Sequence, residues 1–470
     1  MNDMKTMNRK LGLLAGLLAL ALAACGGDDD GDNGDNGDNG DNGDAPDGGD
    51  SAIVTVDEDI TGDATWTADK TYVLATHVFV RGATLTIEPG STVQGQNDSS
   101  LVVTTSGRLV AEGTASAPIV FTSAQPAGAR AAGDWGGVVL LGLATINVEN
   151  GTEVIEGFDA GTDGIEYGGE DDAHDCGSLE YVRIEFAGFE LSTDNELNAL
   201  TVGGCGSDTN LDYIQTHLGA DDGVEFFGGS ATIHHLVVSQ PDDDGIDWDF
   251  GWAGGGQFLI VQQNGVVGNH GFESDSNENN NDATPRSNPT IWNVTLVGSD
   301  SEPGEAGKTQ GGMMLRTGTA GSINNAIIAY FTDWAVDVAD YSTVQQAEGD
   351  HLAINYSYFF QNANDEDSGF PAGYDIDKGE ENDCQNPGPD CAGFDEEAHF
   401  ADETGYHNLF GDPMLMAPLD LAAPNFAPAE GSPVLAGGDT PAAGFDTAAT
   451  FIGAIGATDW TDGWTAYPAN

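Results

Sequence analysis

Short apolar runs with strand-forming residues recur at fairly even distances along the middle of this 470-residue chain. Successive runs start 22, 25, 33, 32 and 29 residues apart. One apolar strand per 20–35 residues is typical of a solenoid, in which each coil buries its inward side chains only against the next coil. A propeller or a jelly roll is the all-β alternative, but the spacing shows no grouping into four-stranded blades. We therefore predict a right-handed parallel β-helix with terminal caps. The six runs begin at Leu211, Ile233, Phe258, Ile291, Ile323 and Leu352.

Two resemblances agree with this fold. Residues 107–122 carry Gly-x-Leu, Gly-Thr and Pro-Ile-x-Phe-Thr turns and resemble the opening coils of parallel β-helix proteins. Residues 135–137, 221–227 and 432–465 are similar to blocks shared by a family of largely uncharacterised exported bacterial proteins. This second resemblance covers roughly residues 80–467. It implies a β-helix at the bacterial surface and brings no established activity.

The first 24 residues predict an export signal. A basic stretch precedes an uninterrupted apolar run, residues 11–24, which is shorter than the roughly 20 residues that a transmembrane helix needs. Small residues stand directly before Cys25, which resembles the lipobox of bacterial lipoproteins. The resemblance implies a lipidated, palmitate-bearing Cys25 as the first mature residue, and Gly26 suggests the outer membrane. Several acyl chains would make this anchor stable. An ordinary signal peptide with a chance cysteine is the alternative.

Residues 25–50 predict a disordered tether between the lipid and a folded body. They include four Gly-Asp-Asn triplets and have nothing to bury, so they cannot offset their ordering entropy. The body is expected to span residues 51–470, with an amino-terminal cap in residues 52–80 and a C-terminal cap near 430–470. Trp460 and Trp464 are expected to pack inside that cap. The acidic, Pro- and Gly-rich residues 362–412 predict a long loop over the late coils, or else the binding element itself.

The body is strongly acidic. The chain has 12 Lys and Arg against 78 Asp and Glu, and removal of residues 1–24 leaves 9 against 77, a formal charge of −68. Nucleic acid and anionic headgroups are therefore poor partners. Solubility in high salt and binding of hard cations such as Ca²⁺ both account for so many carboxylates. The composition leaves both explanations open.

Four cysteines besides Cys25 favour two disulfides in an exported chain. Cys384 and Cys391 bracket a turn-rich loop that can close on itself, and by elimination Cys176 pairs with Cys205. A zinc site is the alternative, but it lacks close Cys-x-x-Cys pairs.

Three consecutive coils carry acids at equal offsets from a glycine, with further acids just before them. Equivalent positions in stacked coils lie about 4.8 Å apart, so such carboxylates repel one another unless something compensates. Ca²⁺, with six to eight oxygen ligands, is the simplest compensator. Acids at solvated turns, screened by salt, are the alternative. The predicted Ca²⁺ ligands are Asp221, Asp222, Glu225, Asp243, Asp244, Asp247, Asp249, Glu273 and Asp275.

The same segment resembles polygalacturonase-like glycosidases, which are also β-helices. Their motif order is an Asp, an Asp pair, a Gly-His-Gly and an Arg-x-Lys. This chain has Asn in place of the first Gly, at position 269, and Gly in place of the Lys, at position 318. The resemblance implies acid and base carboxylates on adjacent coils, with a histidine that tunes them. The residues concerned are Asp222, Asp243, Asp244 and His270, followed by Arg316.

Two functional hypotheses result. The first is an outer-membrane-anchored module that binds Ca²⁺ along residues 221–275 and presents a face to glycans or other surface proteins, without catalysis. The second is a glycoside hydrolase acting on polysaccharide. Trp248 and Trp252 are expected to pack in the core or in turns, and stacking on sugar is the alternative.

Overall fold

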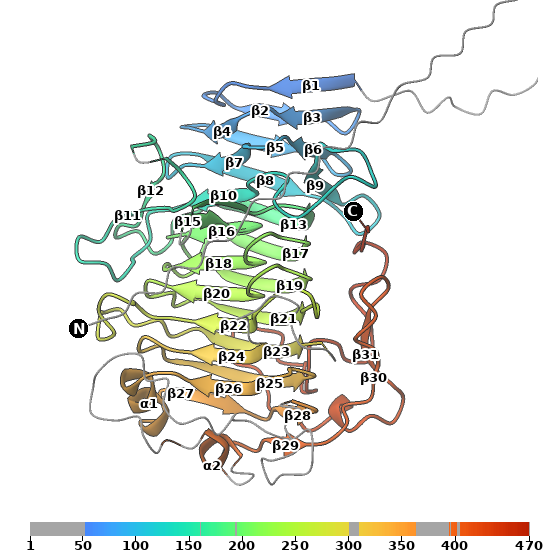
Figure 1. Cartoon of the computed structure of the whole chain (residues 1–470). Coiled ribbons are helices and arrows are strands. Elements are labelled where there is room, and N and C mark those ends of the chain that lie inside the picture. Colours follow the sequence, from blue (N-terminus) through green and yellow to red (C-terminus); the bar gives the residue numbers. More distant parts are fainter. Residues whose placement is uncertain are drawn as a thin grey trace, which may run out of the picture. The chain divides into compact units, whose positions relative to one another are not determined.

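Parallel strands stacked along one axis form the body of the protein in the computed structural model (Figure 1). The structure describes residues 52–159, 161–192, 195–299, 310–362, 394, 396–401 and 405–469. These residues lie within one compact unit, Ser51–Asn470. Cys25, Cys384, Cys391, the leader, the tether and most of the 362–412 loop lie outside the described residues. None of the helices that the structure describes is long and apolar enough to cross a bilayer.

One large sheet has nine parallel strands, which follow one another along the stack. Their inward residues form continuous columns, because the register places like positions of successive coils side by side. One column contains Ile246, Phe272 and Met313, each at most 1% exposed. Burial of each such side chain contributes about 1.5–3 kcal/mol. In order, the strands are β4 (His77–Val80), β7 (Ser100–Val103), β10 (Val138–Leu141), β16 (Leu200–Gly203), β18 (Val224–Phe227), β20 (Ile246–Asp249), β22 (His270–Ser274), β24 (Gly311–Leu315) and β26 (Trp334–Val338).

The other large sheet has sixteen strands and supplies two faces of each coil. The first half of β13 pairs with β8 and its second half with β9, so one long strand replaces two short ones. The strands are β1 (Ala52–Val56), β2 (Ala64–Trp66), β3 (Lys70–Leu74), β5 (Thr84–Ile87), β6 (Thr92–Gly95), β8 (Arg108–Glu112), β9 (Ile119–Ser123), β13 (Gly177–Glu185), β17 (Asn210–His217), β19 (Thr232–Ser239), β21 (Gly255–Gln262), β23 (Thr290–Val297), β25 (Gly321–Ala329), β27 (Leu352–Asn355), β28 (Tyr358–Phe360) and β29 (Leu409–Phe410).

The long strands bend at one residue with a left-handed backbone. Tyr181, Tyr213 and His235 have φ of 49°, 51° and 45°, and the ladder register skips each of them. A left-handed conformation costs about 1–2 kcal/mol for a non-glycine residue. Ring stacking across the coils offsets part of this cost, with centroid distances of 4.3 Å from Tyr181 to Tyr213 and 4.1 Å from Tyr213 to His235. The bend divides the sheet into two faces, and with the nine-stranded sheet each coil has three.

Residues 52–80 and 430–470, which the sequence predicts as the two caps, have other places in the structure. Residues 52–80 supply the first strands of both sheets, since β1 pairs with β3 and β4 pairs with β7. At the other end, α2 (Glu396–Phe400) closes the last coil with Phe400 in the core. The short helix α1 (Tyr341–Glu348) lies between β26 and β27 in the chain and contacts β27.

Residues 411–469, here called the strap, run back along the outside of the sixteen-stranded sheet rather than across the last coil (Figure 1). Trp464 packs edge-on against Tyr181, with ring centroids 5.7 Å apart. The Gln215 side chain both donates to and accepts from the backbone of Ala466, at 2.8 and 2.9 Å. The strap holds β30 (Leu415–Ala417), β31 (Asn425–Pro428) and the turn η1 (Pro433–Leu435).

Two small hairpins complete the described elements. The pair β11 (Glu153–Val154) and β12 (Glu166–Tyr167) is antiparallel, as is the pair β14 (Phe189–Ser192) and β15 (Asn195–Leu197). The first lies in a long segment between β10 and β13, residues 142–176, here called the insert. A Cys176–Cys205 disulfide joins the end of the insert to the turn after β16, as predicted.

Candidate functional site

The outward face of the nine-stranded sheet carries predicted acids on β18, β20 and β22. Inward residues alternate with outward ones along a strand, and Phe226 and Trp248 are the buried neighbours here. The register pairs Glu225 with Asp247, and Asp247 with Glu273. The three carboxylates therefore form one outward column across three coils. Their equal distance from a glycine in the sequence predicts this alignment.

A second column lies at the turns that lead into these strands. Asp222 Oδ1 accepts the backbone N–H of Asp244 at 2.9 Å. Asp244 Oδ1 in turn accepts the backbone N–H of His270. Each carboxylate thus binds the backbone of the next coil. Asp222, Asp244 and His270 are nearly buried, with exposed fractions of 7%, 4% and 4%.

A third set lies at the far ends of the strands, where Arg316 follows β24. Its Nε lies 2.9 Å from Asp275 Oδ1, and its Nη2 contacts Glu273 Oε1. Burial raises the pKa of Asp275 to about 7, although the Arg316 charge opposes the shift. Asp249 Oδ1 accepts the N–H of Phe250 at 2.6 Å. Burial, followed by the charge of Asp275, raises the pKa of Asp249.

Asp244, His270 and Glu273 form a group, the balanced triad, in which opposite charges meet. His270 Nδ1 lies 3.0 Å from Asp244 Oδ1 and 3.2 Å from Glu273 Oε2. Burial lowers the pKa of His270, but the two carboxylates outweigh burial and raise it to about 10. Burial likewise raises the pKa of Glu273, yet His270 and Arg316 hold it below its usual range. Arg316 thus supplies a positive charge at Glu273, while neither ring nitrogen of His270 makes a hydrogen bond of normal geometry among the described residues.

Asp222, Glu225 and Asp247 form a second group, the unbalanced triad. Each offers one oxygen, and these atoms lie within 4.8 Å of one another. Across the residues that the structure describes, none of the three pairs with a Lys, Arg or His side chain. Burial is the largest cause that raises the pKa of each carboxyl. Neighbouring carboxylates add to it, with Asp221 acting on Asp222 and Glu156 acting on Glu225.

Two neutral side chains that the sequence did not single out border the unbalanced triad. Asn198 Nδ2 donates to Glu225 Oε2 at 2.5 Å, and its Oδ1 has no hydrogen-bond partner among the described residues. Thr201 is the register partner of Glu225, and its Oγ1 is also unpartnered within those residues. Both side chains are fully buried. They could be found only from the register, which aligns Leu200 of their coil with Val224 of the next.

The insert covers the outward face of the coils before the acids begin (Figure 1). There the outward residues are apolar, and the insert packs on them in one buried cluster. The face therefore changes from apolar under the insert to acidic on β18, β20 and β22. The cluster contains Phe79, Val102, Val139, Leu141, Ile146, Ile155, Phe158, Ile165, Tyr167, Leu197 and Phe227.

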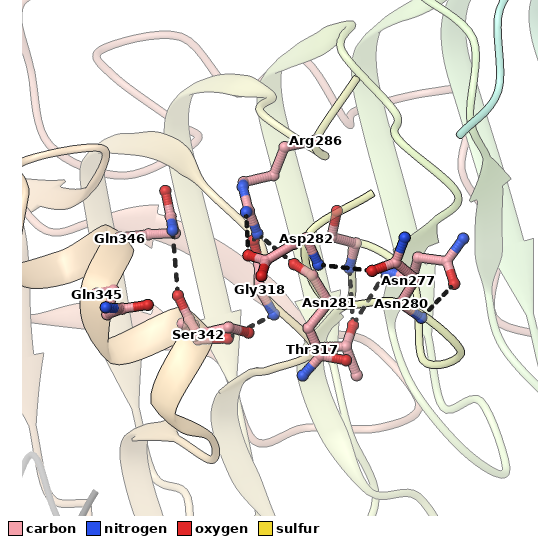
Figure 2. Close-up of polar contacts among 12 residues, drawn as sticks. Asn277, Asn280, Asn281, Asp282, Arg286, Thr317, Gly318, Ser342, Gln345 and Gln346 are labelled. Carbon is pink, nitrogen blue, oxygen red and sulfur yellow. Dashed lines mark hydrogen bonds and ion pairs between the residues drawn. The ribbon is translucent and has the colours of Figure 1, made fainter. Parts of the chain in front are cut away.

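An asparagine-rich loop after β22 lies beside α1 (Figure 2). Arg286 Nη1 donates to the carbonyl oxygen of Asn281 at 2.6 Å and also to that of Gly318. On the other side, Asn147 of the insert donates to the carbonyl oxygen of Ser276 at 2.9 Å. The loop and the base of the insert thus join into one polar wall beside the acidic face.

The remaining residues that the sequence singled out lie outside the two triads. Asp221 acts through its charge on Asp222 and Glu225, and Asp243 is half-buried with its carbonyl accepting the N–H of Asn269 at 3.0 Å. Trp248 and Trp252 are each 1% exposed and pack in the core, so they offer no platform for a sugar.

The glycosidase resemblance requires an acid and a base that are open to substrate and water. Asp222, Asp244 and His270 do lie on successive coils, as that motif order implies. However, they are nearly buried, and both aspartates bind the backbone of the next coil. Asp222 and Asp244 therefore join successive coils and are not open to substrate and water.

The sequence matches the family model for a pectate-lyase-like β-helix domain over residues 58–387. The chain belongs to this family. The match includes the whole nine-stranded sheet and all of the sixteen-stranded sheet except β1 and β29, and it confirms the predicted parallel β-helix. It also agrees with the suspected resemblance to polygalacturonase-like β-helix proteins. Comparison of this pectate-lyase-like β-helix with curated proteins and with solved structures gave no match.

Proposed function

We propose that this pectate-lyase-like β-helix is a Ca²⁺-binding surface module and that the unbalanced triad holds the cation. The observation that carries the proposal is the close approach of three carboxylates from two adjacent coils, none of which forms an ion pair with a Lys, Arg or His side chain in the described residues, although the charge of Arg316 acts on Asp247. At about 4 Å, two unit charges repel by roughly 4 kcal/mol at an effective dielectric constant near 20. A divalent cation would replace this repulsion with attraction.

The available donors suit a hard cation. Ca²⁺ takes six to eight oxygen ligands, including carboxylates, amide carbonyls and water. Besides the carboxylates, Asn198 Oδ1 and Thr201 Oγ1 are buried oxygens without a hydrogen-bond partner in the described residues, as is Asp247 Oδ1. No thiolate or imidazole belongs to the triad, which favours Ca²⁺ over zinc or copper. Asp244, His270 and Glu273 also lie close enough to hold a metal ion, but Arg316 already contacts Glu273 and an imidazole ligand suits transition metals rather than Ca²⁺.

Calorimetric titration of the compact unit Ser51–Asn470 with CaCl₂ tests the site. We expect saturable binding at constant ionic strength, and a dissociation constant about tenfold larger in either Glu225→Gln or Asp247→Asn, equivalent to about 1.4 kcal/mol. Glu278→Gln, which removes an exposed acid just beyond β22, is the matched control and should bind as the wild type does. Binding that Na⁺ abolishes at equal ionic strength, or equal affinities in all variants, would contradict the proposal.

The proposed location is the outer membrane, with Cys25 as the lipid-bearing residue and the acidic face directed at glycans or other surface proteins. We expect the full chain to incorporate labelled palmitate and to sediment with outer membranes. Cys25→Ala should lose the label and appear in the soluble fraction, because the acyl chains of the proposed anchor are attached to Cys25. Cys384→Ala, which removes another cysteine, should keep both properties. Membrane retention of Cys25→Ala would rule out this anchor.

A further inference from the structure

The balanced triad brings one imidazole and two carboxylates from adjacent coils to one point. Asp244 lies in the turn that leads into β20, and His270 and Glu273 belong to β22. One ligand atom from each residue lies within 4.8 Å of the other two. His270 Nδ1 is 3.0 Å from Asp244 Oδ1 and 3.2 Å from Glu273 Oε2. Both carboxylates therefore face the same ring nitrogen.

The imidazole of His270 is enclosed, yet its nitrogens make no conventional contact. The residue is 4% exposed, and neither Nδ1 nor Nε2 makes a hydrogen bond among the residues that the structure describes. Buried polar atoms of native proteins are nearly always bound to a hydrogen-bond partner or an ion. A buried imidazole aimed at two carboxylates therefore indicates a ligand that all three side chains bind.

The distances within the triad suit a small metal ion. With bonds of about 2.1 Å, neighbouring ligand atoms lie about 3.0 Å apart around an octahedral ion and about 3.4 Å apart around a tetrahedral one. The two distances from His270 Nδ1, 3.0 and 3.2 Å, fall within this range. Hydrogen bonds have similar lengths, but the ring nitrogens do not make them within the described part of the chain.

Neighbouring groups hold the three ligands in place. Gln263 is fully buried, and its Nε2 donates to the carbonyl oxygen of His270 at 2.7 Å. Asp244 Oδ1 accepts the backbone N–H of His270. Arg316 contacts Glu273 Oε1, so the other oxygen of this carboxylate faces the imidazole. Such supporting contacts orient the ligands of a metal site before the ion binds.

We propose that the balanced triad binds a divalent first-row transition metal ion, with Zn²⁺ as the probe, through the His270 imidazole and one oxygen each of Asp244 and Glu273. Imidazole is a preferred ligand of such ions, whereas Ca²⁺ takes oxygen ligands. The two carboxylates balance both charges of the ion, which replaces the proton between the imidazole and these acids. The Glu273 side chain is 12% exposed and gives the ion access from the outward face.

Calorimetric titration with ZnCl₂ and X-ray absorption at the zinc edge test this site in the full chain. The protein is stripped with EDTA and then kept in excess CaCl₂, so that acids which prefer a hard cation are already occupied. We expect saturable binding of one Zn²⁺ per chain, with one imidazole nitrogen among its ligands. This inference does not rest on the proposed function, because the unbalanced triad consists of other residues.

Three variants locate the ion. In His270→Gln the imidazole ligand should disappear from the absorption spectrum, and the dissociation constant should rise about hundredfold. Glu273→Gln retains the imidazole and should raise the dissociation constant about tenfold. His351→Gln, which removes an exposed histidine, is the control and should bind Zn²⁺ as the wild type does. A cooperative thermal transition in each variant shows that it is folded.

Four results would overturn the inference. The first is the absence of saturable Zn²⁺ binding in CaCl₂, which would leave the triad as an internal ion pair. The second is a zinc spectrum of the wild type without an imidazole ligand. The third is equal affinity in the wild type, His270→Gln and Glu273→Gln, and the fourth is a loss in His351→Gln as large as that in His270→Gln. None of these results decides the Ca²⁺ site, which Glu225→Gln tests.

Discussion

Replacing Trp248 with alanine is expected to lower the free energy of unfolding by about 3–5 kcal/mol. The side chain is 1% exposed and packs against Phe272 and Trp252, with ring centroids 5.5 and 5.7 Å apart. Its Nε1 donates to Thr319 Oγ1 at 3.1 Å. Alanine would leave a cavity and remove the N–H that the buried Thr319 hydroxyl accepts, while that hydroxyl would still donate to the Ala320 carbonyl at 3.2 Å. Urea unfolding of the wild type and the variant measures this loss as a lower midpoint concentration of urea, provided that the two proteins have the same m-value.

The same variant tests how the core positions the site, because Trp248 lies between Asp247 and Asp249 on β20. Cavity formation beneath these acids should weaken Ca²⁺ binding along with stability. Trp460→Ala removes the same side chain from the strap, where it is partly exposed, and should cost less. A loss smaller than about 1 kcal/mol in Trp248→Ala would contradict its place in the core and would restore stacking on sugar as its role.

The period of the fold could be predicted because every coil has to bury its inward apolar side chains in the same way, against the neighbouring coils. The apolar runs at Leu211 and Ile233 pair in register in β17 and β19, as their spacing indicates. The run at Phe258 is an exception. Its coil places Gly256 opposite Ile233, and the Leu259 side chain fills the space beside that glycine. The residue aligned with Ile233 is thus two positions before the start of the apolar run at Phe258. The apolar spacing alone could not predict this offset, because it depends on where the strand bends.

The acids of the site could be predicted for the same reason, since equal offsets from a glycine give equal positions in neighbouring coils. Their charge balance could not. Arg316 contacts Glu273 from 43 residues away, and the charge of Glu156, in an insert without a repeat, adds to the burial that raises the pKa of Glu225. The strap is a further case, because the pairing of Gln215 with Ala466 spans 251 residues. Contacts between segments this distant leave no periodic signal in a single sequence.

In EDTA, the protein is expected to be more stable at pH 5 than at pH 7.5. A carboxyl whose folded pKa is raised contributes stability below its unfolded pKa and loses it as the pH rises through the folded value. For Asp275 this window runs from 3.8 to about 7, on the order of 2–4 kcal/mol at 1.36 kcal/mol per pH unit. The three carboxyls of the unbalanced triad act in the same direction.

Histidines modify this profile in both directions. The pKa of His270 is raised to about 10, so its stabilising effect is complete below about 6.5 and is lost as the pH rises toward 10. Burial lowers the pKa of His217 to about 4, so its contribution is lost as the pH falls from 6.5. His217 therefore opposes the carboxyls between pH 5 and 6.5. Burial also lowers the pKa of His77, His234 and His399, which therefore act in the same direction as His217. These three are more exposed than the acids of the site, and we expect the net gain at pH 5 to persist.

Ca²⁺ should reduce this difference between pH 5 and pH 7.5 by stabilising the ionised triad. At 100 times its dissociation constant, a ligand that binds only the folded state adds about 2.7 kcal/mol, and this gain should be larger at pH 7.5 than at pH 5 because protons compete for the same oxygens. Asp247→Asn should reduce both the loss of stability at high pH in EDTA and the gain from Ca²⁺. Thermal unfolding at the two pH values, with Na⁺ replacing Ca²⁺ at constant ionic strength, provides the measurement. Equal stability with and without Ca²⁺ at pH 7.5 would mean that protons and solvent alone neutralise these acids, and the cation site would have to be abandoned.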